Sequence, residues 1–138
     1  MAEKVKETSD LQSNEFVQLF AAKYMDEFDL EAHVAKINEL YGKKCELMLS
    51  EMDKYFPESV KIIRPEGGMF IWLELPEGLD SDELLDGALE AGVAYIPGES
   101  FYSADPKKNG IRLNFSLVSE EQIVKGIKIL GDYLKQFC

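Results

Sequence analysis

The sequence predicts an α+β fold: a small, mostly antiparallel sheet of about four strands with helices packed mainly on one face, preceded by a long connector helix. Two observations lead to this prediction. Apolar residues in the first part of the chain recur at three- and four-residue spacings, which is the period of a helix. Farther on, short apolar runs bounded by glycine and proline alternate with further helical segments. We expect a flexible lead-in over 1–12, helices over 13–57 and one α+β domain over 58–138.

Two helices are expected in the first part of the chain. Ser13 or Asn14 is suited to cap the first helix and Asp29 the second, because their side chains accept hydrogen bonds from the free N–H groups of a first helical turn. Pro57 ends the second helix, which would be about 27 residues and about 40 Å long. A helix of that length in a chain of 138 residues indicates a connector between parts of a larger assembly.

A β-hairpin is expected next. The run 60–63 has strand character, and the proline and glycines of 65–68 form a turn. The following run, 69–75, is almost continuously apolar, which indicates a central strand. We therefore expect Phe70 and Trp72 in the hydrophobic core.

Two capping boxes predict the remaining helices. Asp80 with Glu83 opens a helix that ends at Gly92, a residue suited to the left-handed conformation of a helix C-terminus. Ser119 with Gln122 opens the final helix. The strands expected between these two helices are the short runs 93–96 and 111–116.

The composition argues against two classes of partner. The net charge is −11, and the segment 65–106 carries ten acidic residues and no Lys or Arg. Nucleic acids and anionic membranes are bound through basic patches, so neither is expected as a partner. An anionic small molecule is compatible with this charge, because one well-placed arginine can bind a carboxylate.

The cytoplasm is the expected location of the protein. No apolar run approaches the roughly 20 residues of a membrane span, and the N-terminus lacks the apolar stretch of a secretory signal. The two cysteines, Cys45 and Cys138, are too few for a disulfide framework, which fits a reducing compartment.

Arg112 is the residue best suited to binding a ligand. Strand alternation in 111–116 places Arg112, Asn114 and Ser116 on the face opposite the apolar side chains. The chain has only two arginines against 13 lysines, and a guanidinium can bind a carboxylate through two hydrogen bonds where lysine cannot. The alternative is a structural ion pair between Arg112 and a neighbouring carboxylate such as Glu74.

Two glycine-containing turns are candidates for the rim of a binding site. Gly67 and Gly68 allow a ligand to approach the backbone closely, and Pro97, Gly98 and Phe101 place a turn and an aromatic ring after a strand. Neither turn has the spacing of a phosphate-binding loop or a dinucleotide fingerprint. The simpler alternative is that both turns only connect strands.

The sequence offers no second set of catalytic groups. Its single histidine, His33, has no cysteine at metal-ligand spacing, so no metal site is expected. The acidic pairs at the helix starts are accounted for by capping and the helix dipole.

Three segments in this order resemble the C-terminal part of class I/II aminotransferases: 65–72 (PEGGMFIW), 93–102 (VAYIPGESFY) and 109–116 (NGIRLNFS). The sequence is most similar to the branch that contains 2-aminoadipate and aromatic aminotransferases. These are fold-type I enzymes that use pyridoxal 5′-phosphate. The resemblance implies a parent protein that transfers an amino group between an amino acid and a 2-oxo acid, and it extends over nearly the whole chain.

The resemblance also implies roles for individual residues. Arg112 matches the family arginine that binds the α-carboxylate of the substrate, and Asn114 lies next to it on the same strand face. The segments that match the mouth of the active site contain Gly67, Gly68, Pro97, Gly98 and Phe101. Ser13 and Asn14 match a segment that in relatives lies near the active site.

One part of the family pattern is missing from this sequence. The family lysine that forms a Schiff base with the cofactor lies in a serine-rich segment that has no counterpart here. We therefore expect no covalently bound cofactor and no catalysis by this chain alone, which would be a piece of a longer protein, a truncated gene product or a degenerate paralogue. Self-association through the apolar N-terminal helices, as a homodimer, is expected; the alternative is that residues 1–28 are disordered. The alternative is a stand-alone module that binds small carboxylates or a protein partner.

Overall fold

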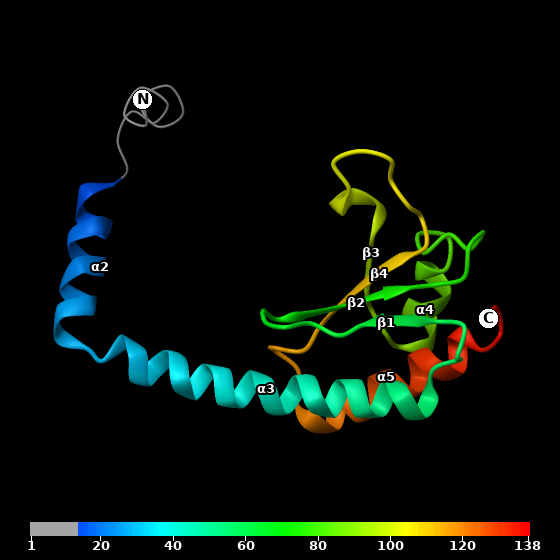
Figure 1. Ribbon diagram of the computed structural model, residues 1–138, viewed down its shortest axis with the longest axis horizontal. Coiled ribbons are helices and arrows are strands. Elements are labelled where there is room, and N and C mark those ends of the chain that lie inside the picture. Colours follow the sequence, from blue (N-terminus) through cyan, green and yellow to red (C-terminus); the bar gives the residue numbers. More distant parts are fainter. Residues whose placement is uncertain (1–13) are drawn as a thin grey trace. The chain divides into compact units, whose positions relative to one another are not determined.

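The structure is a computed structural model and describes residues 14–138. Its contacts divide the chain into two compact units, one that ends at Asn38 and one formed by Glu39–Cys138 (Figure 1). The lead-in expected over 1–12 and the cap candidate Ser13 lie outside the described residues.

The described part of the unit that ends at Asn38 is helical. It contains α2 (Glu15–Glu27) and the beginning of α3 (Leu30–Tyr55), a helix of 26 residues. The Asn14 side chain accepts a hydrogen bond from the Val17 N–H at 3.2 Å, and Asp29 Oδ1 accepts one from the Ala32 N–H at 2.9 Å. Both predicted caps and the long helix are therefore confirmed.

The unit Glu39–Cys138 is built on a four-stranded sheet. The strands β1 (Lys61–Ile63), β2 (Phe70–Glu74), β3 (Ile96–Pro97) and β4 (Gly110–Asn114) lie in the order β1-β2-β4-β3. All three neighbouring pairs are antiparallel, so the predicted α+β fold with its hairpin is confirmed. The apolar strand β2 is central, as expected.

The core lies between the sheet and the helices α4 (Leu85–Ala91), α5 (Glu120–Leu134) and the part of α3 that starts at Glu39. Alternate residues of the two inner strands are buried toward these helices: Ile71 and Leu73 on β2, Ile111 and Leu113 on β4. Full burial of each such side chain contributes about 1.5–3 kcal/mol. Figure 1 shows α3 and α5 on one side of the sheet, so the other face is left for a site.

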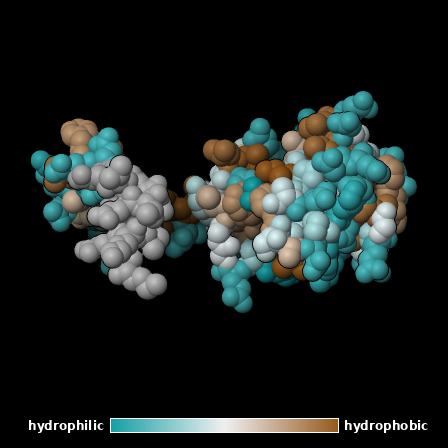
Figure 2. Space-filling view, turned by 90° about the horizontal axis from the view of Figure 1, so that it is seen from above, coloured by the Kyte–Doolittle hydropathy of each residue, from teal (hydrophilic) through white to brown (hydrophobic). Residues whose placement is uncertain are grey.

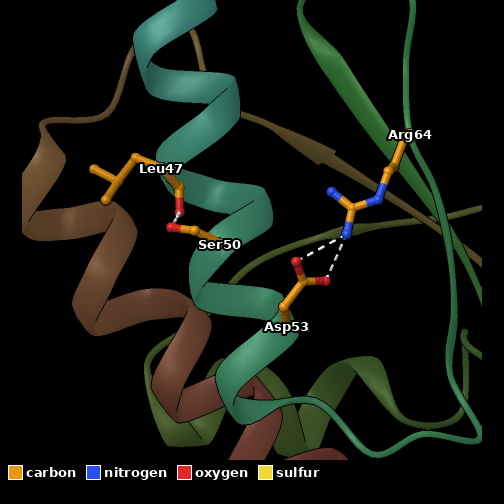
Figure 3. A network of polar contacts seen from close by, with 4 residues as sticks. All are labelled: Leu47, Ser50, Asp53 and Arg64. Atoms are coloured by element: carbon orange, nitrogen blue, oxygen red, sulfur yellow. Dashed lines mark hydrogen bonds and ion pairs between the residues drawn. The ribbon is translucent and has the colours of Figure 1, made fainter.

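The hairpin of β1 and β2 is tied to α3 by an ion pair. One guanidinium nitrogen of Arg64 lies 2.7 Å from Oδ1 and 2.8 Å from Oδ2 of Asp53 (Figure 3). On the same helix, the Ser50 hydroxyl donates a hydrogen bond to the Leu47 carbonyl at 2.8 Å. Because both ionic side chains are exposed, this pair contributes at most about 1 kcal/mol.

The start of α4 differs from its prediction. The helix begins at Leu85, and its N-cap Leu84 makes no side-chain cap hydrogen bond. The Asp80 carboxylate accepts a hydrogen bond from the Asp82 N–H at 3.0 Å and pairs with Lys108 at 2.8 Å. Asp80 is therefore used in a turn and a tertiary ion pair, and it does not cap the helix.

The C-terminus of α4 and the N-terminus of α5 agree with their predictions. Gly92 ends α4 at φ 97°, and Ser119 and Gln122 form both hydrogen bonds of the capping box of α5. Of the strand expected over 93–96, only Ile96 lies in a strand, the two-residue β3, and a short 3₁₀ helix, η1 (Glu99–Phe101), follows it. Within residues 14–138, none of the helices is both long and apolar enough to cross a membrane.

Candidate functional site

The candidate site lies on the face of the sheet opposite the helices. Register pairs Trp72 with Arg112 and Phe70 with Asn114 across β2 and β4. Their neighbours along each strand are buried toward the helices, so these four side chains share the other face. Figure 2 looks onto the molecule from above and shows brown, apolar residues gathered beside hydrophilic ones on the unit Glu39–Cys138.

The Arg112 guanidinium lies against two aromatic rings. Its Cζ atom is 4.2 Å from the centre of the Phe70 ring and 4.0 Å from the centre of the Phe101 ring, which comes from η1. Each cation–π contact at such a partly exposed position contributes about 0.5–1 kcal/mol. The expectation that Phe70 and Trp72 belong to the core is therefore wrong: Phe70 is 37% exposed, and both lie on the face of Arg112.

Arg112 has no ionic partner among the described residues. Its Nε atom is buried and donates no hydrogen bond there, and no carboxylate of residues 14–138 lies within ion-pair distance. Glu74, the alternative partner, pairs with Lys61 at 3.0 Å. An unpaired buried N–H group costs about 1–3 kcal/mol, and no side chain of residues 14–138 offsets this cost or neutralises the charge of Arg112.

Asn114 places a second donor beside Arg112. Its Oδ1 atom accepts hydrogen bonds from the N–H and the hydroxyl of Ser116, both at 2.9 Å. This arrangement fixes the amide so that its N–H groups point away from Ser116 and are available as donors. Phe70, Ile96, Arg112, Asn114 and Leu117 are among the residues that line a pocket of about 340 Å³ on this face.

Trp72 supports the aromatic part of the site. Its ring packs on two glycines: a Cβ atom at Gly98 would lie 2.6 Å from the indole, and one at Gly110 would lie 2.5 Å from it. The same ring meets Phe101 and Tyr102 edge-on, with centroids 6.0 Å apart in both cases. Small residues at these two positions let the indole approach the backbone and hold η1 next to Arg112.

The chain is similar in sequence to known aminotransferases. The aromatic-amino-acid aminotransferase 1 of Thermococcus litoralis is 43% identical over 134 residues, which are 97% of this chain and 32% of that protein. The chain corresponds to the C-terminal part of aminotransferases. No protein-family model matches it.

Solved aminotransferase structures share the fold. The kynurenine aminotransferase of Pyrococcus horikoshii is 44% identical with a TM-score of 0.87, over 96% of this chain and 33% of that chain. The α-aminoadipate aminotransferase of Thermus thermophilus, complexed with N-(5′-phosphopyridoxyl)-L-leucine, is 32% identical with a TM-score of 0.85. This match covers 96% of this chain and 34% of that chain. The chain spans about a third of the length of the relatives it matches.

The sheet places three of the other residues that the aminotransferase resemblance assigned to the site, Gly67, Gly68 and Pro97. Gly67 and Gly68 form the hairpin turn, and the hydrogen bond from the Phe115 N–H to the Met69 carbonyl at 3.3 Å places this turn at the Asn114 end of the sheet. Pro97 pairs with Ile111, so it belongs to the helix-facing side. Ser13 lies outside the described residues, and Asn14 caps α2 in the other unit.

The pocket beside Arg112 does not by itself supply the groups that hold the aminotransferase cofactor. The pocket beside Arg112 is lined by no lysine that could attach pyridoxal phosphate and by no aspartate that could pair with its ring nitrogen. Within residues 14–138, no group of three His, Cys, Asp or Glu side chains is placed to hold a metal ion. What the face offers is a pair of donors for a carboxylate.

Phe70 and Trp72 are the site residues that the sequence interpretation missed. The signal that could have revealed them is the two-residue period of β2 relative to Arg112 on β4. A strand paired with β4 must present every second side chain on the face of Arg112, and in β2 these positions hold Phe70 and Trp72.

Proposed function

We propose that this chain forms the substrate-carboxylate site of a pyridoxal-phosphate-dependent aminotransferase, which transfers an amino group between an amino acid and a 2-oxo acid. Arg112 binds the α-carboxylate, and Asn114 donates an additional hydrogen bond. The observation that carries the proposal is the Arg112 guanidinium, buried at Nε and without an ionic partner among residues 14–138. Its support is the similarity to aminotransferases over 97% of the chain.

The proposed action of this chain is to orient the substrate. A carboxylate in the plane of the guanidinium accepts two charge-assisted hydrogen bonds, each shorter and stronger than a neutral one. Fixing the carboxylate restricts rotation of the amino acid, so that its amino group and Cα–H point away from the sheet. The rings of Phe70 and Phe101, 4.2 and 4.0 Å from the Arg112 Cζ atom, shield part of the guanidinium from water and so strengthen an ion pair formed there.

The remaining reaction groups belong to a cofactor domain that the matched region does not include. We propose that this chain alone is inactive and binds no covalent cofactor. Incubation with pyridoxal phosphate followed by dialysis tests this. The absorbance of the cofactor should disappear from the dialysed protein sample. A retained aldimine band would contradict the proposal.

We further propose a cytoplasmic homodimer. Cys45 and Cys138 are both free thiols, which supports a reducing compartment. In α2 no residue is buried within the described structure, and apolar residues such as Phe16 and Phe20 are exposed. Such residues support an interface between two copies of the N-terminal helices.

A titration followed by NMR tests the carboxylate site directly. Addition of a 2-oxo acid to the chain should shift the signals of Arg112 and Asn114, and the variant Arg112→Gln should show no such shift. A ligand-induced shift of the Asn114 signal that persists in Arg112→Gln would overturn the proposed role. The stand-alone module, which is the second candidate, predicts the same binding but no upstream cofactor domain in the reading frame.

A further inference from the structure

We infer that Phe70 and Phe101 are positioning residues that clamp the Arg112 guanidinium between their rings, so that it presents only its N–H edge to a planar carboxylate. This inference rests on the proposed function, in which Arg112 binds the substrate carboxylate. It goes further because it assigns two aromatic residues to carboxylate recognition and gives the clamp a geometric selectivity.

The two rings reach Arg112 from opposite ends of β4. Phe70 pairs with Asn114, two residues beyond Arg112 along the strand. Phe101 lies edge-on to Trp72, whose ring rests on Gly110, two residues before Arg112. The Arg112 Cζ atom is 4.2 Å from the first ring centre and 4.0 Å from the second, so the cation contacts both rings at once.

The position of Phe101 is itself fixed by local contacts. The Gly98 N–H donates to the Gly110 carbonyl at 2.8 Å, which attaches the start of η1 to β4. The Phe101 N–H donates to the Gly98 carbonyl at 3.0 Å and closes the turn. The Trp72 ring then blocks movement of the Phe101 ring along the sheet.

A clamp of this kind prepares the arginine for one binding geometry. A free arginine side chain samples many rotamers, and ordering it on binding reduces affinity. Rings on both sides keep the guanidinium ordered before a ligand arrives and cover the faces through which an anion could otherwise approach. What stays open is the edge, where a planar carboxylate accepts two parallel hydrogen bonds.

NMR of the arginine side chains tests the clamp without any ligand. The chain has two arginines, so the exposed Arg64 serves as an internal control for Arg112. Ring currents should move the Arg112 Nε–H proton upfield of that of Arg64, and Phe70→Leu and Phe101→Leu should each remove part of this shift. Phe137→Leu, at an exposed aromatic residue that packs on Tyr133, is the matched control and should change nothing. Equal proton shifts for both arginines, unaffected by Phe101→Leu, would overturn the clamp.

A second measurement tests its role in binding. Acetate is titrated into the 138-residue chain at constant ionic strength, with chloride as the spherical reference anion, and binding is followed by the fluorescence of Trp72, the only tryptophan. Phe101→Leu and Phe70→Leu should weaken acetate binding about three- to tenfold and leave the thermal unfolding midpoint close to that of the wild type. Phe101→Tyr should bind acetate as the wild type does, because tyrosine keeps the aromatic ring that leucine lacks.

The variant Arg112→Gln separates failure of the clamp from failure of the proposed function. Acetate binding that is lost in Arg112→Gln and retained in both leucine variants would overturn the clamp alone. Acetate binding that is retained in Arg112→Gln, or absent from the wild type, would overturn the proposed function, and the ring-current shift would still decide whether the clamp exists.

Discussion

The indole ring of Trp72 rests on Gly98, at a distance that excludes any side chain from this position. A Cβ atom at Gly98 would lie 2.6 Å from the indole Cη2 atom and 2.8 Å from the Gly110 Cα atom. Atoms essentially never approach this closely, so either the indole or the backbone of β4 would have to move. Because Phe101 leans on the same indole, the contact couples a glycine to the surroundings of Arg112.

The substitution Gly98→Ala is expected to destabilise the protein. Its backbone φ of −81° suits alanine, so the loss comes from crowding alone and should amount to about 1–3 kcal/mol in the free energy of unfolding. Denaturant unfolding followed by Trp72 fluorescence measures it. Gly67→Ala is the matched control, since its Cβ atom would meet nothing within 4 Å, and equal effects of the two substitutions would contradict the prediction.

Under the proposed function, the substitution Arg112→Lys is expected to raise KM for the amino acid in an aminotransferase that contains this chain. Lysine keeps the charge but loses the two-point contact, which costs about 1.5–3 kcal/mol, or roughly ten- to hundredfold in KM. Steady-state kinetics with the amino donor measures the change. Arg64→Lys, at the exposed ion pair with Asp53, should leave KM unchanged, and an unaltered KM in Arg112→Lys would remove Arg112 from the site.

Local patterns were enough to predict the order of the elements and most helix ends. Caps at Asn14, Asp29 and Ser119 depend on residues three positions apart, so spacing alone reveals them. The start of α4 could not be predicted in this way. Asp80 has two local options, a helix cap or a turn, and the choice is set by Lys108, which lies 28 residues away.

In the candidate site, too, some features follow from local sequence patterns and others depend on tertiary contacts. Alternation along β4 was sufficient to place Arg112 and Asn114 on one face. The apolar run of β2 conceals its own alternation, because Phe70 and Trp72 are as apolar as the buried residues between them. Their exposure depends on which face the helices cover, and the absence of an ionic partner for Arg112 within residues 14–138 is likewise a tertiary property.

The close packing of α5 on the end of α3 gives a stability prediction within one helix. A Cβ atom at Gly131 would lie 2.7 Å from the Tyr55 carbonyl oxygen, whereas one at Gly126 would meet nothing within 4 Å. Gly131→Ala should therefore lower the free energy of unfolding by about 1–3 kcal/mol. Gly126→Ala should raise it by up to about 1 kcal/mol through helix propensity. Thermal unfolding of the two variants compares them, and a gain in stability for Gly131→Ala would show that the helices are packed less closely.

The turn that replaces the predicted cap should respond to acid. The hydrogen bond from the Lys108 ammonium, together with that from the Asp82 N–H, lowers the pKa of Asp80 below its ordinary value. A carboxylate with a lowered pKa in the folded state stabilises the protein above its unfolded pKa of about 4, and this stability is lost as the pH falls through the folded value. The unfolding midpoint of the wild type should thus fall more between pH 5 and pH 2, roughly the range in which a paired carboxylate is protonated, than that of Asp80→Asn. Lys108→Gln should reduce the difference, and parallel curves for wild type and Asp80→Asn would contradict the assignment.

The helix α2 leads to a prediction of self-association. Phe16, Leu19 and Phe20 lie at helical spacing and are between 64% and 76% exposed, which is unusual for apolar side chains of a monomer. We expect the chain to form dimers at micromolar concentration, measured by light scattering, because pairing these helices removes the apolar surface from water. The double substitution Phe16→Glu and Phe20→Glu should give a monomer. Gln18→Glu adds a negative charge to the same helix at an exposed polar position and should leave the dimer intact. A wild-type chain that is monomeric at all concentrations, or a dimer that survives the double substitution, would place the interface elsewhere or exclude it.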